Sequence, residues 1–249
     1  MSDPISCEAV FFDLFDTLIH IDYEGFPRVT FAGQERPSTA GRLRDFLAGK
    51  GYDIPLDRFL NELIAVYLDI QKEKAAEHRE IAATTRHERL LARLGINAGP
   101  ELAGEMTELH MGYLVRHARP AERATELLEA YAAKVPVALI SNFDHTSAGH
   151  AILEKFGWTA RFKSIVISDA LGLCKPRREL YDLAVRETGV PHEKAVMVGD
   201  THLADVKGPK DLGLRAIWIN LKNLELAPEQ VQPDQTIRAL KELPDVLKV

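Results

Sequence analysis

The chain has 249 residues, of which 46% are apolar and 27% are charged, a composition typical of a globular protein with a sizeable core. The formal net charge of −6 argues against a nucleic-acid partner, because phosphate backbones are bound through clustered Lys and Arg side chains. Two cysteines, Cys7 and Cys174, offer no disulfide framework or zinc site. We see no signal peptide or membrane-spanning stretch, and therefore expect a cytoplasmic monomer or homodimer with reduced thiols and no membrane partner.

The first predicted strand covers residues 8–13, an apolar and aromatic run that ends in Asp13. The segment that follows has helical periodicity and no strong strand signal. Its helices are predicted at 38–50, 56–78, 83–94 and 99–117. We therefore expect an α-helical cap domain over residues 21–119, inserted directly after the first strand.

After residue 120, short apolar strands alternate with helical patterns. The strands are predicted at 135–141, 163–167, 195–199 and 214–219, and the helices at 120–133, 146–156, 176–189 and 202–212. Strands without polar alternation are typical of a parallel sheet that is covered on both faces. This order predicts a doubly wound, Rossmann-like α/β core built from residues 1–20 and 120–249.

Polar side chains stand at the ends of the predicted strands and at the start of one predicted helix. They are Asp13, Ser141, Asn142, Lys175, Asp200 and Asp205. The carboxyl ends of parallel strands meet at one edge of a sheet, so these side chains are expected to converge. Carboxylates held close together repel unless a cation lies among them, and oxygen ligands suit Mg²⁺. A lysine and a hydroxyl beside them suit an anion, which indicates metal-assisted phosphoryl transfer to a carboxylate.

Four short motifs resemble those of the haloacid dehalogenase superfamily, in the subfamily with a helical cap after the first motif. They are DLFDT at 13–17, ISN at 140–142, GLCKP at 172–176 and GDTHLAD at 199–205. Each motif is weak alone, but four in order at strand ends are specific, and the resemblance covers about residues 8–220. The SNFD and GDTHLADVKGP stretches are most similar to the rhythmically-expressed-protein-2-like branch.

This resemblance implies a Mg²⁺-dependent hydrolase that acts on a small, anionic, phosphorylated substrate. Asp13 would attack phosphorus, become an aspartyl-phosphate and also ligate the metal ion. Asp200 would bind the ion directly, and Asp205 would act through water or by orienting Lys175. The backbone carbonyl of Phe15 would be a further metal ligand.

The resemblance also implies the groups that contact the substrate. Ser141 would donate a hydrogen bond to the transferring phosphoryl group, and Lys175 would neutralise both that group and Asp13. Thr17 and Asn142 are further candidates for substrate binding, although Thr17 could equally cap the turn after the first strand.

Phe15 departs from the family pattern. Phosphatases of the family carry a second Asp at this position, which protonates the leaving group and then activates water. Such general acid–base help contributes ~10²–10⁴-fold to a rate. A phosphatase with this sequence would need a displaced acid, for which the candidates are Asp16, His20, Asp144 or a cap residue.

Two other interpretations remain open. The second interpretation is a 2-haloacid dehalogenase or another C–X hydrolase that acts through an ester on Asp13. Haloacid dehalogenases resemble this chain in carrying an aromatic residue at the position of Phe15, and a halide leaves without protonation. A weakly active or non-catalytic protein that binds a phosphorylated ligand is the third interpretation. The phosphohydrolase ranks first because Asp200 and Asp205 are present, whereas dehalogenases lack this acidic metal loop.

Overall fold

The structure is a computed structural model that describes residues 3–249. The chain divides into two compact units. The core unit comprises the chain up to His20 together with Arg119–Val249, and the helical unit is Ile21–Ala118. Within residues 3–249, no helix combines the length and apolar character needed to cross a bilayer.

A six-stranded sheet organises the core unit, in the order β11-β10-β9-β2-β7-β8, with every neighbouring pair parallel. Its strands are β2 (Ala9–Phe12), β7 (Val137–Ser141), β8 (Ser164–Ile167), β9 (Ala195–Gly199), β10 (Arg215–Ile219) and β11 (Gln235–Ile237). The five predicted strands are confirmed. The sequence does not predict β11, because this three-residue edge strand is partly polar and lacks a continuous apolar run.

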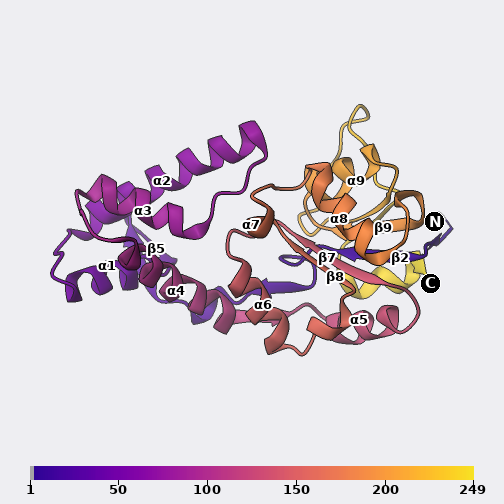
Figure 1. Cartoon of the computed structure of the whole chain (residues 1–249), viewed down its shortest axis with the longest axis horizontal. Coiled ribbons are helices and arrows are strands. Elements are labelled where there is room, and N and C mark those ends of the chain that lie inside the picture. Colours follow the sequence, from indigo (N-terminus) through magenta and orange to yellow (C-terminus); the bar gives the residue numbers. More distant parts are fainter. Residues whose placement is uncertain (1–2) are drawn as a thin grey trace. The chain divides into compact units, whose positions relative to one another are not determined.

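Helices cover both faces of this sheet, which confirms the doubly wound α/β core. In Figure 1, α8 and α9 lie on one side of the sheet, and α5 and α6 lie on the other. The helices of the core unit are α5 (Ala124–Ala132), α6 (Thr146–Lys155), α7 (Ser168–Leu171), α8 (Arg178–Thr188), α9 (Gly208–Asp211) and α10 (Leu243–Val246). The helix predicted over 202–212 is only partly right, because a wider π-helical segment, His202–Lys207, precedes the short α9.

The helical unit contains the four helices that the sequence predicts: α1 (Ala40–Gly49), α2 (Leu56–Glu77), α3 (Ala83–Leu94) and α4 (Pro100–His117). The expectation of no strand in this segment is wrong, because β4 (Arg28–Phe31) and β5 (Gln34–Pro37) form an antiparallel hairpin. Its two-residue loop, Ala32 and Gly33, has φ values of 49° and 75°. Two positive φ angles are typical of the tight turn whose twist matches that of paired strands.

Apolar burial explains both units. Every residue of β2 is fully buried, as expected for a central strand that is covered on both faces. A separate apolar cluster joins the helices of the helical unit and includes Leu47, Phe59, Leu90 and Met106. Two further pairs of short strands are present: β3 (Ile19–Ile21) pairs with β6 (Ala118–Pro120), and β1 (Ile5–Ser6) pairs with β12 (Leu247–Lys248).

Candidate active site

The carboxyl ends of three neighbouring strands carry the candidate residues. Asp13 follows β2, and its N–H donates to the carbonyl of Val198 in β9 at 2.9 Å, which extends the sheet by one residue. Ser141 is the last residue of β7, and Asp200 follows β9. The chain runs from β2 outward to β7 and β8 and returns on the other side at β9, so these residues lie where the strand order reverses. Open α/β sheets bind their ligands at such a point.

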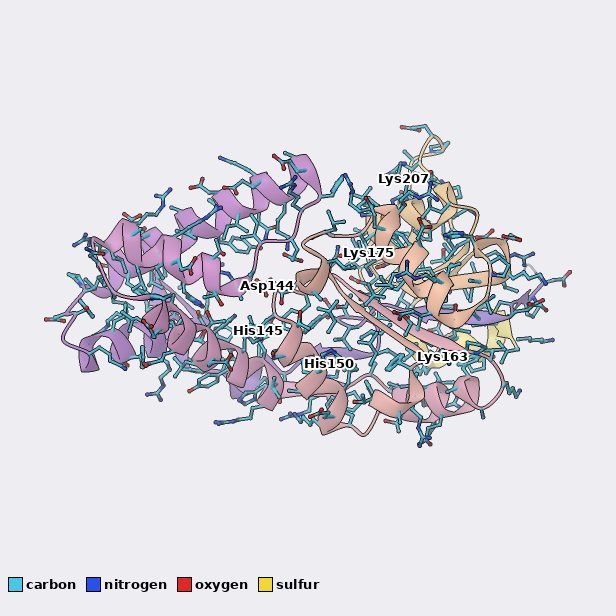
Figure 2. All side chains as sticks on the ribbon, in the orientation of Figure 1. Asp144, His145, His150, Lys163, Lys175 and Lys207 are labelled. Atoms are coloured by element: carbon cyan, nitrogen blue, oxygen red, sulfur yellow. The ribbon has the colours of Figure 1, made fainter. Side chains whose placement is uncertain are left out.

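Lys175 joins two of the carboxylates. Its Nζ donates to Oδ1 of Asp13 at 2.8 Å and to Oδ1 of Asp205 at 2.7 Å. The side chains of Lys175 and Asp205 are each 1% exposed, and that of Asp13 is 10% exposed. Lys175 lies in the segment between α7 and α8, and Figure 2 labels its side chain. Burial of charged groups costs free energy unless each is paired, so the three side chains depend on one another.

The protonation equilibria show an excess of negative charge in this cluster. Burial, together with the carboxylates of Asp205 and Asp200, raises the pKa of Asp13 to about 7, against the opposing effect of Lys175. Burial, Asp205 and Asp16 likewise raise the pKa of Asp200 to about 6. Burial disfavours the ammonium of Lys175, but the two carboxylates that it contacts outweigh burial and raise its pKa. An additional cation would therefore stabilise the ionised acids.

The geometry of the acids fits a divalent cation. One carboxylate oxygen from each of Asp13, Asp200 and Asp205 lies within 4.8 Å of the others. Both oxygens of Asp205 already accept hydrogen bonds, one from Lys175 and one from the N–H of Thr201 at 2.9 Å. Asp13 and Asp200 are therefore the better direct ligands, and their hard oxygen atoms suit Mg²⁺.

Neighbouring groups fix the metal loop after β9. A Cβ atom on Gly199 would collide with the carboxyl group of Asp205, so only glycine permits this close approach. The indole Nε1 of Trp218 donates to the carbonyl of Asp200 at 2.7 Å. Residue spacing alone does not predict this contact of Trp218. A buried indole N–H near a strand end is the signal that could have suggested a partner.

Asn142 uses its side chain to hold the loop that carries Lys175. The amide Nδ2 donates to the carbonyl of Lys175 at 3.1 Å, and Oδ1 accepts from the N–H of Lys175 at 2.7 Å. Residues 33 positions apart in the chain are thus paired through one side chain. The structure therefore gives Asn142 a role in positioning Lys175.

Two candidate hydroxyl groups are buried without a protein partner. Ser141 is fully buried and Thr17 is 1% exposed. Among residues 3–249, neither Ser141 Oγ nor Thr17 Oγ1 has a hydrogen-bond partner. A buried hydroxyl without a partner costs free energy, so an anionic ligand oxygen at the end of β7 would satisfy Ser141.

A cavity of about 170 Å³ opens beside these groups. Its lining residues are Asp13, Phe15, Asp16, Asn142, Lys175, Asp200, Thr201, Ala204 and Asp205. The ring of Phe15 packs against that of Phe143, with 4.8 Å between the ring centroids. Of the residues that the sequence suggested as a displaced acid, Asp16 lines this cavity, whereas His20 and Asp144 do not.

The comparisons with known proteins agree with this arrangement. The family of haloacid dehalogenase-like hydrolases matches residues 7–213. Pyrimidine 5'-nucleotidase YjjG of Escherichia coli is 30% identical over 145 residues, which cover 58% of this chain and 64% of that protein. Phosphoserine phosphatase of Thermus thermophilus is 30% identical over 144 residues, which cover 58% of this chain and 57% of that protein. In both cases the match spans less than two thirds of the relative's own length.

Solved structures extend the likeness to nearly the whole chain. The 2-haloacid dehalogenase of Pseudomonas syringae superposes with a TM-score of 0.71 at 23% identity, covering 96% of this chain and 97% of that one. This likeness concerns the fold. The family match over residues 7–213 shows that the chain belongs to the haloacid dehalogenase-like hydrolases.

Proposed function

We propose that the chain is a Mg²⁺-dependent phosphohydrolase that transfers the phosphoryl group of a small anionic metabolite to Asp13. The observation that carries this proposal is the buried ammonium of Lys175, held between Asp13 and Asp205 beside the carboxylate of Asp200. A cluster with raised acid pKa values in a cavity is typical of a catalytic site. The names of the nucleotidase and phosphatase relatives support the class of substrate.

In this proposal Asp13 is the nucleophile. Its carboxylate attacks phosphorus, and the bond to the leaving group breaks as the aspartyl-phosphate forms. Lys175 keeps Asp13 oriented and balances the charge on the phosphoryl oxygens. Ser141 donates its unpartnered hydroxyl to one of these oxygens. Water then cleaves the aspartyl-phosphate and restores the carboxylate.

Asp13 and Asp200 would hold the metal ion, with Asp205 acting on it indirectly. A bound Mg²⁺ would offset the negative charge of the acids and of the phosphoryl group. The backbone carbonyl of Phe15 is a further candidate ligand, because Phe15 lines the same cavity as the acids. Thr201 completes the loop by donating its N–H to Asp205.

The helical unit would act as a cap that selects the substrate, and the chain would work in the cytoplasm as a monomer or homodimer. Thr17 would support substrate binding through its buried hydroxyl. The motif stretches that resemble the rhythmically-expressed-protein-2-like branch suggest where in the family the chain belongs.

A second candidate is hydrolysis of a carbon–halogen bond. The aromatic pair of Phe15 and Phe143 beside Asp13 favours it, because halide departs as an anion and needs no proton donor. Asp13 would displace the halide to form an ester, which water would then cleave. The carboxylates of Asp200 and Asp205 favour the phosphohydrolase, since carboxylates in such proximity need a cation.

A panel of phosphorylated metabolites and p-nitrophenyl phosphate, assayed with and without Mg²⁺, tests the proposal. We expect phosphate release that needs the metal and falls by at least ~10³-fold in Asp13→Asn. Chloride release from 2-haloacids without added metal would instead support the second candidate. If thermal stabilisation by phosphorylated compounds occurred without any turnover, the chain would be a binding protein.

A further inference from the structure

The residues that line the cavity beside Asp13 offer few groups that could give a proton to a leaving group. The amide of Asn142 is used by the backbone of Lys175. The hydroxyl of Thr201 points to the carboxylate of Asp200, with 3.2 Å between the oxygen atoms. The ammonium of Lys175 already donates to two carboxylates, those of Asp13 and Asp205.

The ring pair of Phe15 and Phe143, called the aromatic edge below, includes a residue that lines the cavity beside Asp13. The rings of Phe15 and Phe143 meet at 4.8 Å and an angle of 58°, an arrangement that aromatic pairs favour. The backbone of Phe143 is fixed on both sides, because its N–H donates to Ser168 Oγ at 2.8 Å and its carbonyl accepts from that hydroxyl at 3.1 Å. The aromatic edge is therefore held rigidly, and it supplies no exchangeable proton.

Asp16 is the remaining carboxyl group of the cavity outside the metal cluster. It is exposed, and its backbone has a φ of 56°. Its charge contributes to the raised pKa of Asp200, so its carboxyl group influences the metal-binding acids. A second pocket of the core unit, which Trp218 and Asn220 also line, shares Asp16 and Asp200. Asp16 therefore lies on the Asp200 side of the site. It is the alternative proton donor to the leaving group, and a test has to exclude it.

We propose that the substrates are phosphoryl compounds whose leaving group departs as a stable anion, namely acyl or aryl phosphates in preference to alkyl phosphates. This inference rests on the proposed phosphohydrolase function and names its substrate class. An oxygen of the Asp13 carboxylate forms a bond to phosphorus while the bond to the leaving oxygen breaks. The bonding electrons leave with that oxygen as a carboxylate or phenolate, so this step needs no proton. Water then cleaves the aspartyl-phosphate to give dihydrogen phosphate and the Asp13 carboxylate.

The test is a series of phosphate esters with graded leaving-group pKa values, from acetyl phosphate and p-nitrophenyl phosphate through phenyl phosphate to an alkyl phosphate, assayed with Mg²⁺. For the wild type we expect kcat/KM to fall steeply with leaving-group pKa, by more than ~10²-fold between the aryl and alkyl ends, as expected without general acid catalysis. Asp16→Asn should show the same slope. A flat dependence in the wild type would overturn the proposal, and so would an alkyl-specific loss in Asp16→Asn.

Two substitutions at one position sharpen the test. Phe15→Asp introduces an acid and should raise kcat/KM for the alkyl phosphate by ~10-fold or more, with a smaller change for the aryl phosphate. Phe15→Leu removes the ring without adding an acid and should keep the steep slope. If Phe15→Leu flattened the slope as much as Phe15→Asp, the ring and not the missing acid would set the preference, and the proposal would be wrong. No Asp13-dependent phosphate release from any member of the series would instead refute the phosphohydrolase function itself.

Discussion

The two units both bury titratable side chains, but in opposite electrostatic settings. In the helical unit, His87 is 1% exposed, and its Nδ1 lies 2.8 Å from Thr107 Oγ1. The hydroxyl of Thr107 donates to the carbonyl of Ala103, so its oxygen accepts from Nδ1–H of His87. Burial, with Arg86 and His110, lowers the pKa of His87 to about 3, so this ring is neutral at physiological pH.

The core unit instead keeps charges buried. Lys175 forms ion pairs with Asp13 and Asp205. The pKa of Asp13 is raised even though Lys175 lies beside it. A buried group that is neutral and hydrogen-bonded is typical of a structural role. Buried charges with perturbed pKa values are typical of a site where a bound ligand stabilises them. This contrast supports the proposed ligand-binding role of the cluster at Asp13 and favours a structural role for His87.

The largest expected effect on stability comes from removing the buried cation. Lys175→Met leaves Asp13 and Asp205 without their counter-charge and should lower the free energy of unfolding by ~3–5 kcal/mol at pH 8. The loss should shrink at pH 5, where raised pKa values let Asp13 protonate. Chemical denaturation at both pH values measures it, with Lys222→Met, a substitution at an exposed lysine, as the control. Equal losses at pH 5 and pH 8 would contradict the electrostatic account.

His87→Ala should have the next largest effect on stability. We expect it to lower the free energy of unfolding by ~1–3 kcal/mol, because Thr107 then loses its buried hydrogen-bond partner. The neutral ring stabilises the fold above the usual pKa of histidine, and this contribution is lost as pH falls toward the lowered pKa of about 3. The cost should therefore be greatest near pH 7. Mg²⁺ affinity, measured by calorimetry, should remain that of the wild type. A weakened Mg²⁺ affinity in His87→Ala would contradict a purely structural role for His87.

Asp200→Asn should raise, and not lower, the free energy of unfolding of the metal-free protein. A raised carboxyl pKa stabilises the fold at pH values below about 4, and this contribution is lost as pH rises through about 6. Replacing the acid removes the charge repulsion, so we expect a gain of about 1 kcal/mol at pH 8, reduced by solvent screening, or about 2–4 °C in Tm. Thermal melts at pH 4 and pH 8 measure it.

The same variant should lose the stabilisation that Mg²⁺ gives the wild type. Calorimetric titration with Mg²⁺ provides the second readout. Equal heats for the wild type and Asp200→Asn would remove Asp200 from the proposed metal site, whatever its effect on the metal-free Tm.

Asn142→Ala should lower the free energy of unfolding by only ~0.5–1.5 kcal/mol, because the two hydrogen bonds to the Lys175 backbone are partly exposed. Its effect on phosphate release should appear in kcat more than in KM, since the side chain of Asn142 is hydrogen-bonded to the backbone of Lys175. Asn142→Asp keeps the acceptor for the Lys175 N–H and should recover part of the rate. A change confined to KM would instead indicate direct substrate contact.

Much of the site was accessible from the sequence for a simple physical reason. Parallel strands bring their carboxyl ends to one edge, so residues such as Asp13 and Asp200 were expected to converge before any contact was known. The four helices of the helical unit followed from apolar periodicity in the same way. Local patterns were sufficient wherever the strand or helix period decided the structure.

The remaining features depend on pairs that are distant in the chain. The amide of Asn142 on the Lys175 backbone and the indole of Trp218 on the Asp200 carbonyl leave no trace in residue spacing. The sequence does not predict the β4–β5 hairpin, because each strand has only four residues and β5 is polar and mostly exposed. Gly33 in the turn is the signal that indicates it.

Peptide mass mapping of the acid-quenched protein during turnover of acetyl phosphate or p-nitrophenyl phosphate with Mg²⁺ tests the central claim most directly. The donor side chains around Asp13 are already hydrogen-bonded, so none of them can activate the water that cleaves the aspartyl-phosphate. Hydrolysis of the aspartyl-phosphate should therefore be slow, and the phosphoryl group should accumulate on Asp13. The account predicts one phosphoryl group on the peptide that contains Asp13, and none in Asp13→Asn. Sustained turnover with Asp13 unmodified at every time point would contradict it.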